Sequence, residues 1–357
     1  MMNLTSQIIY QGEGYLVEAL GTLEHDVTIV GFASRGASAR YNPVTPADFD
    51  RRFLKASLLK WNLPVNFVNF TSNRNCWFML PEIVEACSAL RKRLGGQRLI
   101  TYGSSMGGFA AINCSTFLDA DYFLALSPLY SIFDPFMKSI RDTRFREERE
   151  ALNDAFDGIS KGWHAGRTGL VAYDDRHERD TRHAQEILKQ TSGHELKVPF
   201  AGHPVGPSLN RAYSLKKILV QSISGPIDVD EVQKVVHSNL ENSAGALAAD
   251  GDGLPEFLNL VRQGQRSVDP SAWVSASQTL VDLAKKESID EDVLGALCSS
   301  FPDNEFWAGA PSKLVQCAWG FCRALEELGD LSRAREFAEE RMPEPQRSRF
   351  LARASTD

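Results

Sequence analysis

The residues most able to do chemistry gather around Ser105. This serine stands between Gly103 and Gly107, after the apolar run 98–102 and before the small-residue run 108–111. A serine hydroxyl is a weak nucleophile at neutral pH, so it needs a turn that lifts it clear of a sheet, a base, and space for backbone N–H donors. Glycines two positions before and after the serine supply that space because they lack a Cβ atom. The spacing therefore predicts a nucleophilic serine on a strand-to-helix turn.

The glycine register distinguishes Ser105 from its neighbour Ser104. For Ser104 to be the nucleophile, Tyr102 and Met106 would both have to be glycine. A Gly-x-Ser-x-Gly run arises by chance in roughly one sequence in ten of this composition, so a glycine-rich turn with an idle serine is the alternative. The apolar strand before the serine and the helix after it favour the catalytic interpretation.

A candidate base follows the last predicted strand, residues 195–200. His203 comes directly after Gly202 there, just before a predicted helix that begins near Ser208. An imidazole, with a reference pKa of about 6.5, can take the proton of Ser105 and later pass it to a leaving group. The alternative is a loop histidine bonded to the backbone.

Three aspartates compete for the role of the acid: Asp174, Asp175 and Asp180. We choose Asp174 because it comes directly after a predicted strand. Asp180 stands just before a predicted helix, where it would serve as an N-cap. Asp180 and then Asp175 are the second and third choices. The chosen carboxylate would fix the tautomer of His203 and stabilise its imidazolium form.

The same acidic run also permits a metal site. Its carboxylates and imidazoles lie close together in the sequence, at Asp174, Asp175, His177, Asp180 and His183. Oxygen and imidazole ligands at this density suit several divalent metals. The charged residues around Glu178 are typical of a solvated surface, however, and the acid–base interpretation already accounts for the loop. We therefore expect no metal.

The elements that must position these residues alternate along the chain. Apolar runs predict strands at 26–32, 65–70, 98–102, 121–128, 168–173 and 195–200. Helices are predicted between them at 51–60, 82–94 and 181–190. This alternation predicts an α/β protein with a mostly parallel sheet covered by helices. Ligands of such sheets bind at the carboxyl ends of the strands, where the serine, the aspartates and the histidine all fall.

The glycine-flanked Ser105 and the chain order serine, aspartate, histidine resemble the α/β-hydrolase superfamily over residues 8–224. The resemblance implies the α/β-hydrolase fold, with a nucleophile elbow at the serine and a Ser-His-Asp triad. It also implies a helical cap or lid insertion, which we place at about 129–166.

The resemblance further implies an oxyanion hole made of two backbone N–H groups. One donor would be Met106, the residue after the nucleophile. The second would be Ser34 or Ala33, in the loop after an earlier strand. The family's usual His-Gly pair in that loop is replaced here by Phe32 and Ala33.

Three further side chains are candidates for substrate contact. Arg35 follows the oxyanion loop, and Arg74 and Trp77 stand in a loop expected at the same edge of the sheet. The alternative is a tryptophan packed at the sheet edge and arginines that are solvated.

Beyond Gly225 and Pro226 the strand pattern stops. Helical periodicity continues at 229–239, 256–263, 273–286, 314–327 and 332–341. We therefore predict two domains, an α/β-hydrolase domain over 1–224 and an all-α accessory domain of helical hairpins over 225–357. The segment 314–341, with Gly329 and Asp330 at its turn, resembles a tetratricopeptide-type hairpin.

Composition limits the class of protein. The 357 residues carry a formal charge of -7, which argues against a nucleic-acid-binding surface. The six cysteines show no zinc-like spacing and favour reduced thiols. The amino-terminal residues show no targeting signal, and no apolar run is long enough to span a membrane. These features favour a cytoplasmic protein that binds neither nucleic acid nor membrane.

These observations predict a serine hydrolase that cleaves a carboxylic ester or thioester through an acyl-enzyme, with no cofactor. One alternative is an acyltransferase that uses the same acyl-enzyme. The other is a non-catalytic hydrolase fold that works as a binding module. The expected partners are a small or acylated substrate and, through the carboxyl-terminal helices, a protein.

Overall fold

The computed structural model of the chain describes residues 6–35, 61–199, 201–211, 214–240, 253–263, 270–286, 288–303, 305–308 and 310–353, with residues 248 and 268. The chain divides into two compact units, Met1–Val236 and His237–Asp357. This boundary lies beyond the 224/225 division inferred from the sequence. The reason is that Gln233 of α9 (Val229–Leu240) pairs with β8, donating to the Lys197 carbonyl at 2.7 Å and accepting from its amide at 2.9 Å.

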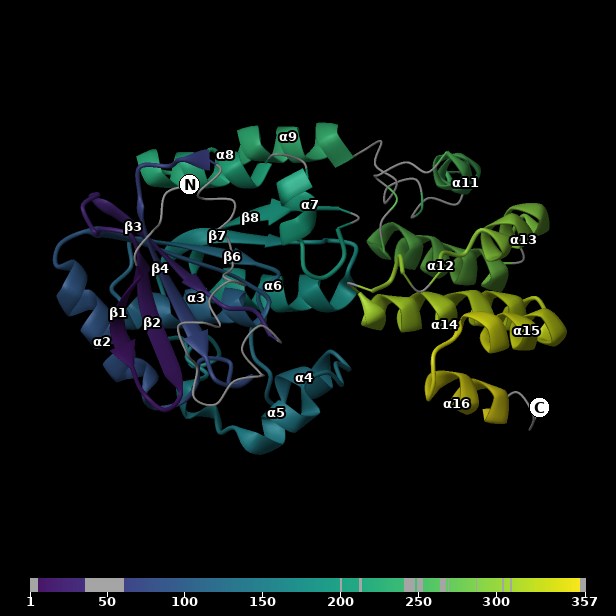
Figure 1. The fold of residues 1–357 in the computed structure, drawn as a ribbon, viewed down its shortest axis with the longest axis horizontal. Coiled ribbons are helices and arrows are strands. Elements are labelled where there is room, and N and C mark those ends of the chain that lie inside the picture. Colours follow the sequence, from purple (N-terminus) through teal and green to yellow (C-terminus); the bar gives the residue numbers. More distant parts are fainter. Residues whose placement is uncertain are drawn as a thin grey trace. The chain divides into compact units, whose positions relative to one another are not determined.

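The first unit is built on an eight-stranded sheet of order β1-β2-β4-β3-β5-β6-β7-β8 (Figure 1). The strands are β1 (Ser6–Gln11), β2 (Tyr15–Leu20), β3 (Val27–Phe32), β4 (Asn66–Ser72), β5 (Arg98–Ser104), β6 (Tyr122–Leu126), β7 (Thr168–Tyr173) and β8 (Ser192–Lys197). β2 pairs antiparallel with both β1 and β4, and the other neighbours are parallel. The carboxyl ends of β3 to β8 therefore share one edge, and the predicted α/β-hydrolase fold class is confirmed.

Helices cover both faces of this sheet. Figure 1 shows α8 (Ser214–Ser224) and α9 on one side, and α2 (Ile83–Leu94), α3 (Met106–Phe117) and α6 (Glu178–Gln190) on the other. The short α7 (Gly206–Arg211) precedes α8. The first ten residues of α3 are all buried, because its glycines and alanines let the helix approach the strands closely.

The six strands predicted from the sequence all form, with ends shifted by a few residues. The sequence analysis missed β1 and β2, which are short runs separated by Gly12 and Gly14. The predicted helix 51–60 lies outside the described residues. Helix α6 begins at Glu178 rather than at residue 181, because the side chain of His177 caps it by accepting from the Asp180 amide.

The cap lies between β6 and β7, as predicted. It contains α4 (Phe136–Ser139), α5 (Arg146–Ala151) and the 3₁₀ helix η2 (Asp154–Phe156). Its far end is fastened to α3 through Asn113, whose amide donates to the Phe156 carbonyl at 2.8 Å and accepts from the Gly158 amide at 3.0 Å. His164 adds a hydrogen bond of 2.6 Å to Thr116 of the same helix. Buried polar pairs of this kind fix the cap to the elbow helix.

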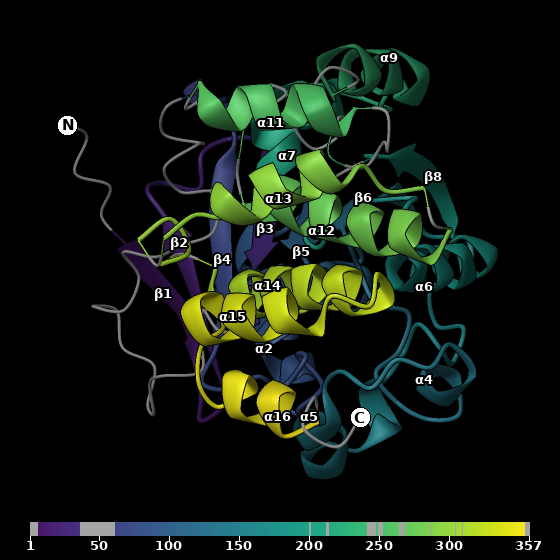
Figure 2. The ribbon, with the colours of Figure 1, turned by 90° about the vertical axis from the view of Figure 1, so that its right-hand side faces the viewer.

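The second unit is helical throughout its described residues. It contains α11 (Leu254–Arg262), α12 (Pro270–Lys285), α13 (Glu291–Ser299), α14 (Pro311–Glu327), α15 (Leu331–Arg341) and α16 (Gln346–Arg353), which are labelled in Figure 2. α14 packs against α12 and α15. Gly329, with φ 77°, ends α14, and Asp330 caps α15. The resemblance of this hairpin to a tetratricopeptide repeat stays a prediction.

In the described part of the chain, no helix combines the length and the apolar character that crossing a bilayer requires.

Candidate active site

Ser105 sits on a strained turn between β5 and α3. Its φ of 55° is one that side chains other than glycine rarely adopt, and strain of this kind is typical of a nucleophile elbow. Two glycines make the turn possible. A Cβ atom on Gly103 would lie 2.0 Å from the Gly107 carbonyl oxygen, and one on Gly107 would lie 2.4 Å from the Phe32 carbonyl oxygen. The Ser105 amide donates to the Leu126 carbonyl at 2.8 Å, which ties the turn to β6.

The predicted nucleophile and base meet at this turn. Ser105 Oγ lies 2.9 Å from His203 Nε2. The other imidazole nitrogen, Nδ1, lies 2.7 Å from Asp180 Oδ2. With Nδ1 protonated, His203 donates to Asp180 and can accept the Ser105 proton at Nε2. Residues 98 positions apart along the chain thus form one continuous hydrogen-bonded chain.

The choice of Asp174 as the partner of His203 is wrong, and the second choice, Asp180, occupies that place. Asp174 follows β7 directly, but its Oδ2 accepts from the Gly202 amide at 2.6 Å and its Oδ1 from the Arg176 amide at 3.0 Å. The early start of α6 explains the difference. Asp180 lies in the first helical turn, with 1% of its side chain exposed, rather than at a solvated N-cap. The imidazole nitrogens of His203 face Asp180 and Ser105, and not the third choice, Asp175.

The two buried aspartates have opposite electrostatic environments. Burial alone would raise the pKa of Asp180, but the charge of His203, its hydrogen bond to Asp180 and the nearby imidazole of His177 outweigh this effect and hold that pKa well below its usual range. Burial raises the pKa of Asp174, and the two backbone amides that it accepts only partly offset this effect. Asp180 is therefore the carboxylate that stays ionised beside the imidazole.

The oxyanion-hole candidates lie on either side of the elbow. Met106 is the first residue of α3, so its N–H is one of the amides that a helix leaves without an internal acceptor. The Ala33 N–H donates to the Phe70 carbonyl at 3.1 Å, which leaves Ser34 as the candidate for the second donor. The Ser34 hydroxyl donates to the Ser104 carbonyl at 3.0 Å and so links this loop to the elbow strand.

The three candidate substrate contacts have different surroundings. Arg35 is 46% exposed and forms an ion pair of 2.6 Å with Glu148 of α5, so it joins the oxyanion loop to the cap. Arg74 is exposed, as a solvated arginine would be. Trp77 is fully buried, with its ring centroid 4.9 Å from that of Phe145. Trp77 is therefore a core side chain, and the expectation that it faces substrate is corrected.

Among the described residues, no group of three or more histidine, cysteine, aspartate or glutamate side chains has the geometry of a metal site. Asp174 and Asp180 direct their oxygens to Gly202 and His203 rather than to a common point.

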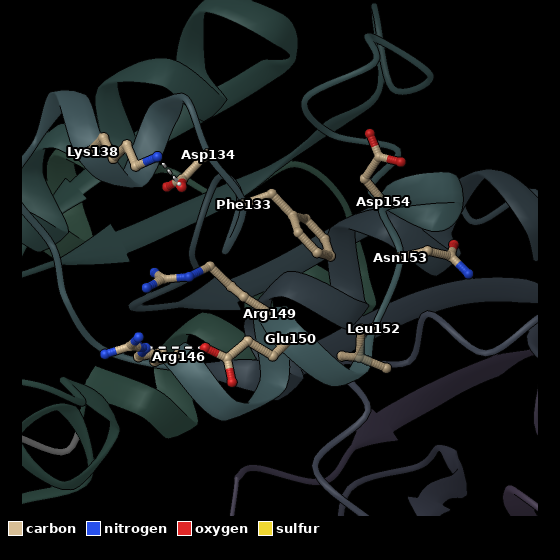
Figure 3. Close-up of a pocket in the computed structure, with 9 residues that line it drawn as sticks. All are labelled: Phe133, Asp134, Lys138, Arg146, Arg149, Glu150, Leu152, Asn153 and Asp154. Carbon is tan, nitrogen blue, oxygen red and sulfur yellow. Dashed lines mark hydrogen bonds and ion pairs between the residues drawn. The ribbon is translucent and has the colours of Figure 1, made fainter.

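A hollow of about 620 Å³ lies in the cap (Figure 3). It is lined by Phe133, Asp134, Lys138, Arg146, Arg149, Glu150, Leu152, Asn153 and Asp154. Four of its charged side chains form local ion pairs, Lys138 with Asp134 at 2.9 Å and Arg146 with Glu150 at 3.0 Å. Arg149 Nη1 donates to the Arg144 carbonyl at 3.0 Å. One wall of the hollow therefore adjoins Arg144, whose Nη2 lies 3.8 Å from Asp180 Oδ1.

The chain was compared with protein families, curated proteins and solved structures. No protein-family model matches the chain, and no curated protein matches it significantly. Similar solved structures include a hormone-sensitive lipase from a metagenome library (15% identity, TM-score 0.38, 67% of this chain and 84% of that chain). They also include the esterase Pf2001 of Pyrococcus furiosus (13%, 0.41, 66% and 92%) and the capsule O-acetyltransferase of Neisseria meningitidis serogroup A (13%, 0.40, 61% and 95%).

These identities and TM-scores are too low to transfer a substrate. The α/β-hydrolase fold of this chain rests on its own strand order, its serine elbow at the end of β5 and its histidine after β8.

Proposed function

We propose that this protein is a serine hydrolase that cleaves a carboxylic ester or thioester through an acyl-enzyme. One observation carries the proposal: the chain of hydrogen bonds from Ser105 Oγ through His203 to Asp180, with distances of 2.9 and 2.7 Å. A serine without a catalytic role would not require an imidazole whose other nitrogen is hydrogen-bonded to a buried carboxylate.

In the first half of the reaction, Ser105 Oγ attacks the acyl carbon while His203 Nε2 takes the hydroxyl proton. Negative charge then develops on the substrate's carbonyl oxygen. The Met106 and Ser34 N–H groups would stabilise it. Asp180 stabilises the imidazolium, which returns its proton to the departing alcohol or thiol.

In the second half, water attacks the acyl-enzyme and His203 acts in the reverse sense. It first takes a proton from water and then returns it to Ser105 Oγ as the acid product leaves. An alcohol that replaces water in this step would make the same site an acyltransferase, so the two activities differ only in what reaches the acyl-enzyme.

A fluorophosphonate probe tests this proposal, because it phosphonylates only a serine that a base activates. We expect the full-length protein to be labelled at Ser105, Ser105→Ala to lose all labelling, and the matched Ser104→Ala to retain it. A folded wild-type protein that resists the probe would refute the proposal. If Ser104→Ala lost the label and Ser105→Ala retained it, the nucleophile would be Ser104 and not Ser105.

Product analysis separates hydrolysis from transfer. With a p-nitrophenyl ester and added alcohols, we expect free acid as the main product. A new ester as the main product would instead identify an acyltransferase.

All three residues of this hydrogen-bonded chain belong to the first unit. We propose that the helical second unit takes no part in bond breaking and serves to bind a protein partner.

A further inference from the structure

We propose that Arg144 of the cap is a positioning residue, which holds Asp180 in its orientation toward His203 and so makes the cap part of the reactive unit. This inference rests on the proposed function. It concerns the side of the triad carboxylate that faces away from His203.

The two oxygens of Asp180 have different partners. Oδ2 accepts from His203, whereas Oδ1 is buried and has no hydrogen-bond donor among the described residues. His177 Nδ1 lies 3.1 Å from Oδ1. This nitrogen accepts a hydrogen bond from the Asp180 amide at 3.3 Å, so in this tautomer it carries no proton that it could donate to Oδ1. Among the described arginines and lysines, Arg144 approaches Oδ1, and its Nη2 lies 3.8 Å away.

A buried carboxylate oxygen without a donor is costly, and a cation nearby offsets that cost. At 3.8 Å, the guanidinium is close enough to stabilise the negative charge of the buried carboxylate. Without the guanidinium, the ionised Asp180 would gain by rotating Oδ1 toward water, which would break its alignment with His203 Nδ1. This is why we assign orientation, and not only charge, to Arg144.

Arg144 is itself held in place. Its Nε lies 3.0 Å from each carboxylate oxygen of Asp142, and its Nη2 lies 2.6 Å from Asp142 Oδ2. The Asp142 side chain is fully buried. The guanidinium also lies over the Phe145 ring, at 5.3 Å from the ring centroid. Because Asp142 and Phe145 hold the guanidinium of Arg144 in place, it can in turn hold Asp180 in place.

The helix that carries Asp180 is anchored by the same cap. His183, one turn after Asp180 on α6, accepts at Nδ1 from the Tyr130 amide at 2.9 Å. Its Nε2 then carries the proton and faces Asp142 Oδ2 at 3.6 Å. Both ends of the cap segment 130–144 therefore contact the face of α6 that presents Asp180. Asp180 lies on helix α6 rather than at the end of a strand. Its position is therefore fixed by contacts of α6 with the cap and not by the sheet.

The test uses the second-order rate constant for phosphonylation of Ser105 in the full-length protein, which needs no known substrate. We expect Arg144→Gln to slow this reaction by about tenfold or more. Arg144→Lys, which keeps the charge but not the fork, should recover part of the rate. The matched control is Arg146→Gln on α5, because Arg146 is 81% exposed and forms a surface ion pair with Glu150. It should react as wild type does.

A double-mutant cycle shows whether Arg144 acts through Asp180. If it does, Arg144→Gln will slow wild type but will have no further effect in an Asp180→Asn background. Equal slowing in both backgrounds, or no slowing in wild type, would overturn the inference while leaving the labelling of Ser105 intact. Failure of wild type to label at all would instead refute the proposed function.

Removing Arg144 leaves Asp142 buried without its partner, so Arg144→Gln can unfold the cap. The variant Asp142→Asn/Arg144→Gln removes both charges and avoids that cost. Its melting temperature is measured together with its rate. A double variant that is as stable as wild type but about tenfold slower supports the proposal, and one that reacts at the wild-type rate overturns it.

Discussion

Asp174 Oδ2 accepts a hydrogen bond from the Gly202 amide at 2.6 Å, one residue before the imidazole. The carboxylate at the end of β7 therefore holds the backbone of the histidine loop, while Asp180 holds the ring of His203. Gly202 has a φ of 64°, a conformation that the loop needs in order to present its amide to Asp174. Two aspartates share a task that the sequence analysis assigned to one.

The two aspartates should respond differently to substitution by asparagine. Asp180→Asn removes the charge beside His203 and favours the wrong imidazole tautomer, so phosphonylation of Ser105 should slow by about a thousandfold. Asp174→Asn loses one of two backbone hydrogen bonds, so it should slow by about tenfold and lose ~1 kcal/mol of stability. Rate constants and urea unfolding of both variants check this. The reverse order of effects would return the acid role to Asp174.

His177 is predicted to matter chiefly as the N-cap of α6. Its Nδ1 accepts the Asp180 amide at 3.3 Å. His177→Ala removes this acceptor and should cost about 1 kcal/mol in the free energy of unfolding, whereas His177→Asn supplies a favoured cap and should restore stability. Urea unfolding of the two variants measures the difference. Equal stability of both would show that the cap contributes nothing.

The elbow should not tolerate a methyl group at Gly103. An added Cβ would lie 2.0 Å from the Gly107 carbonyl oxygen, a backbone atom that cannot move aside. Gly103→Ala should therefore cost at least ~3 kcal/mol, and the soluble yield should fall. Gly96→Ala is the matched control, because a Cβ there meets nothing within 4 Å. If the two variants unfold at the same urea concentration, the elbow packing is looser than described.

The cap anchor at His164 should make stability depend on pH. Burial, with a smaller effect of Arg167, lowers the pKa of His164 to about 4. The unfolded state, with a pKa of about 6.5, therefore binds this proton more readily, so the free energy of unfolding falls by about 3 kcal/mol as pH drops from 6.5 to 4.

Asp157 acts in the opposite sense over part of that range, because burial raises its pKa to about 6. The folded state holds that proton more tightly, so Asp157 contributes stability below its unfolded pKa that is lost as pH rises to 6. The contribution of His164 is therefore measured as a difference. Wild type should lose more stability than His164→Gln between pH 6.5 and 4, and parallel curves would contradict the assignment.

Local sequence determined the turn at Ser105 and the order of the elements. The turn at Ser105 requires glycine two positions before and after the serine, because a Cβ at either place would overlap backbone. The strands around it are continuous apolar runs, since both faces of a parallel strand are covered. The same logic located His203, in the loop that follows β8.

The carboxylate that meets His203 and the contacts of the cap depended on tertiary structure. Spacing along the chain favoured Asp174, but whether a carboxylate meets an imidazole depends on where α6 begins, and that depends on a cap supplied by His177. Trp77 and Arg144 show the same limit. A tryptophan in a polar loop and an arginine in a charged run both look exposed in sequence. Only the folded cap buries Trp77 against Phe145 and brings Arg144 within 3.8 Å of Asp180. Contacts between distant segments are set by packing and not by local pattern.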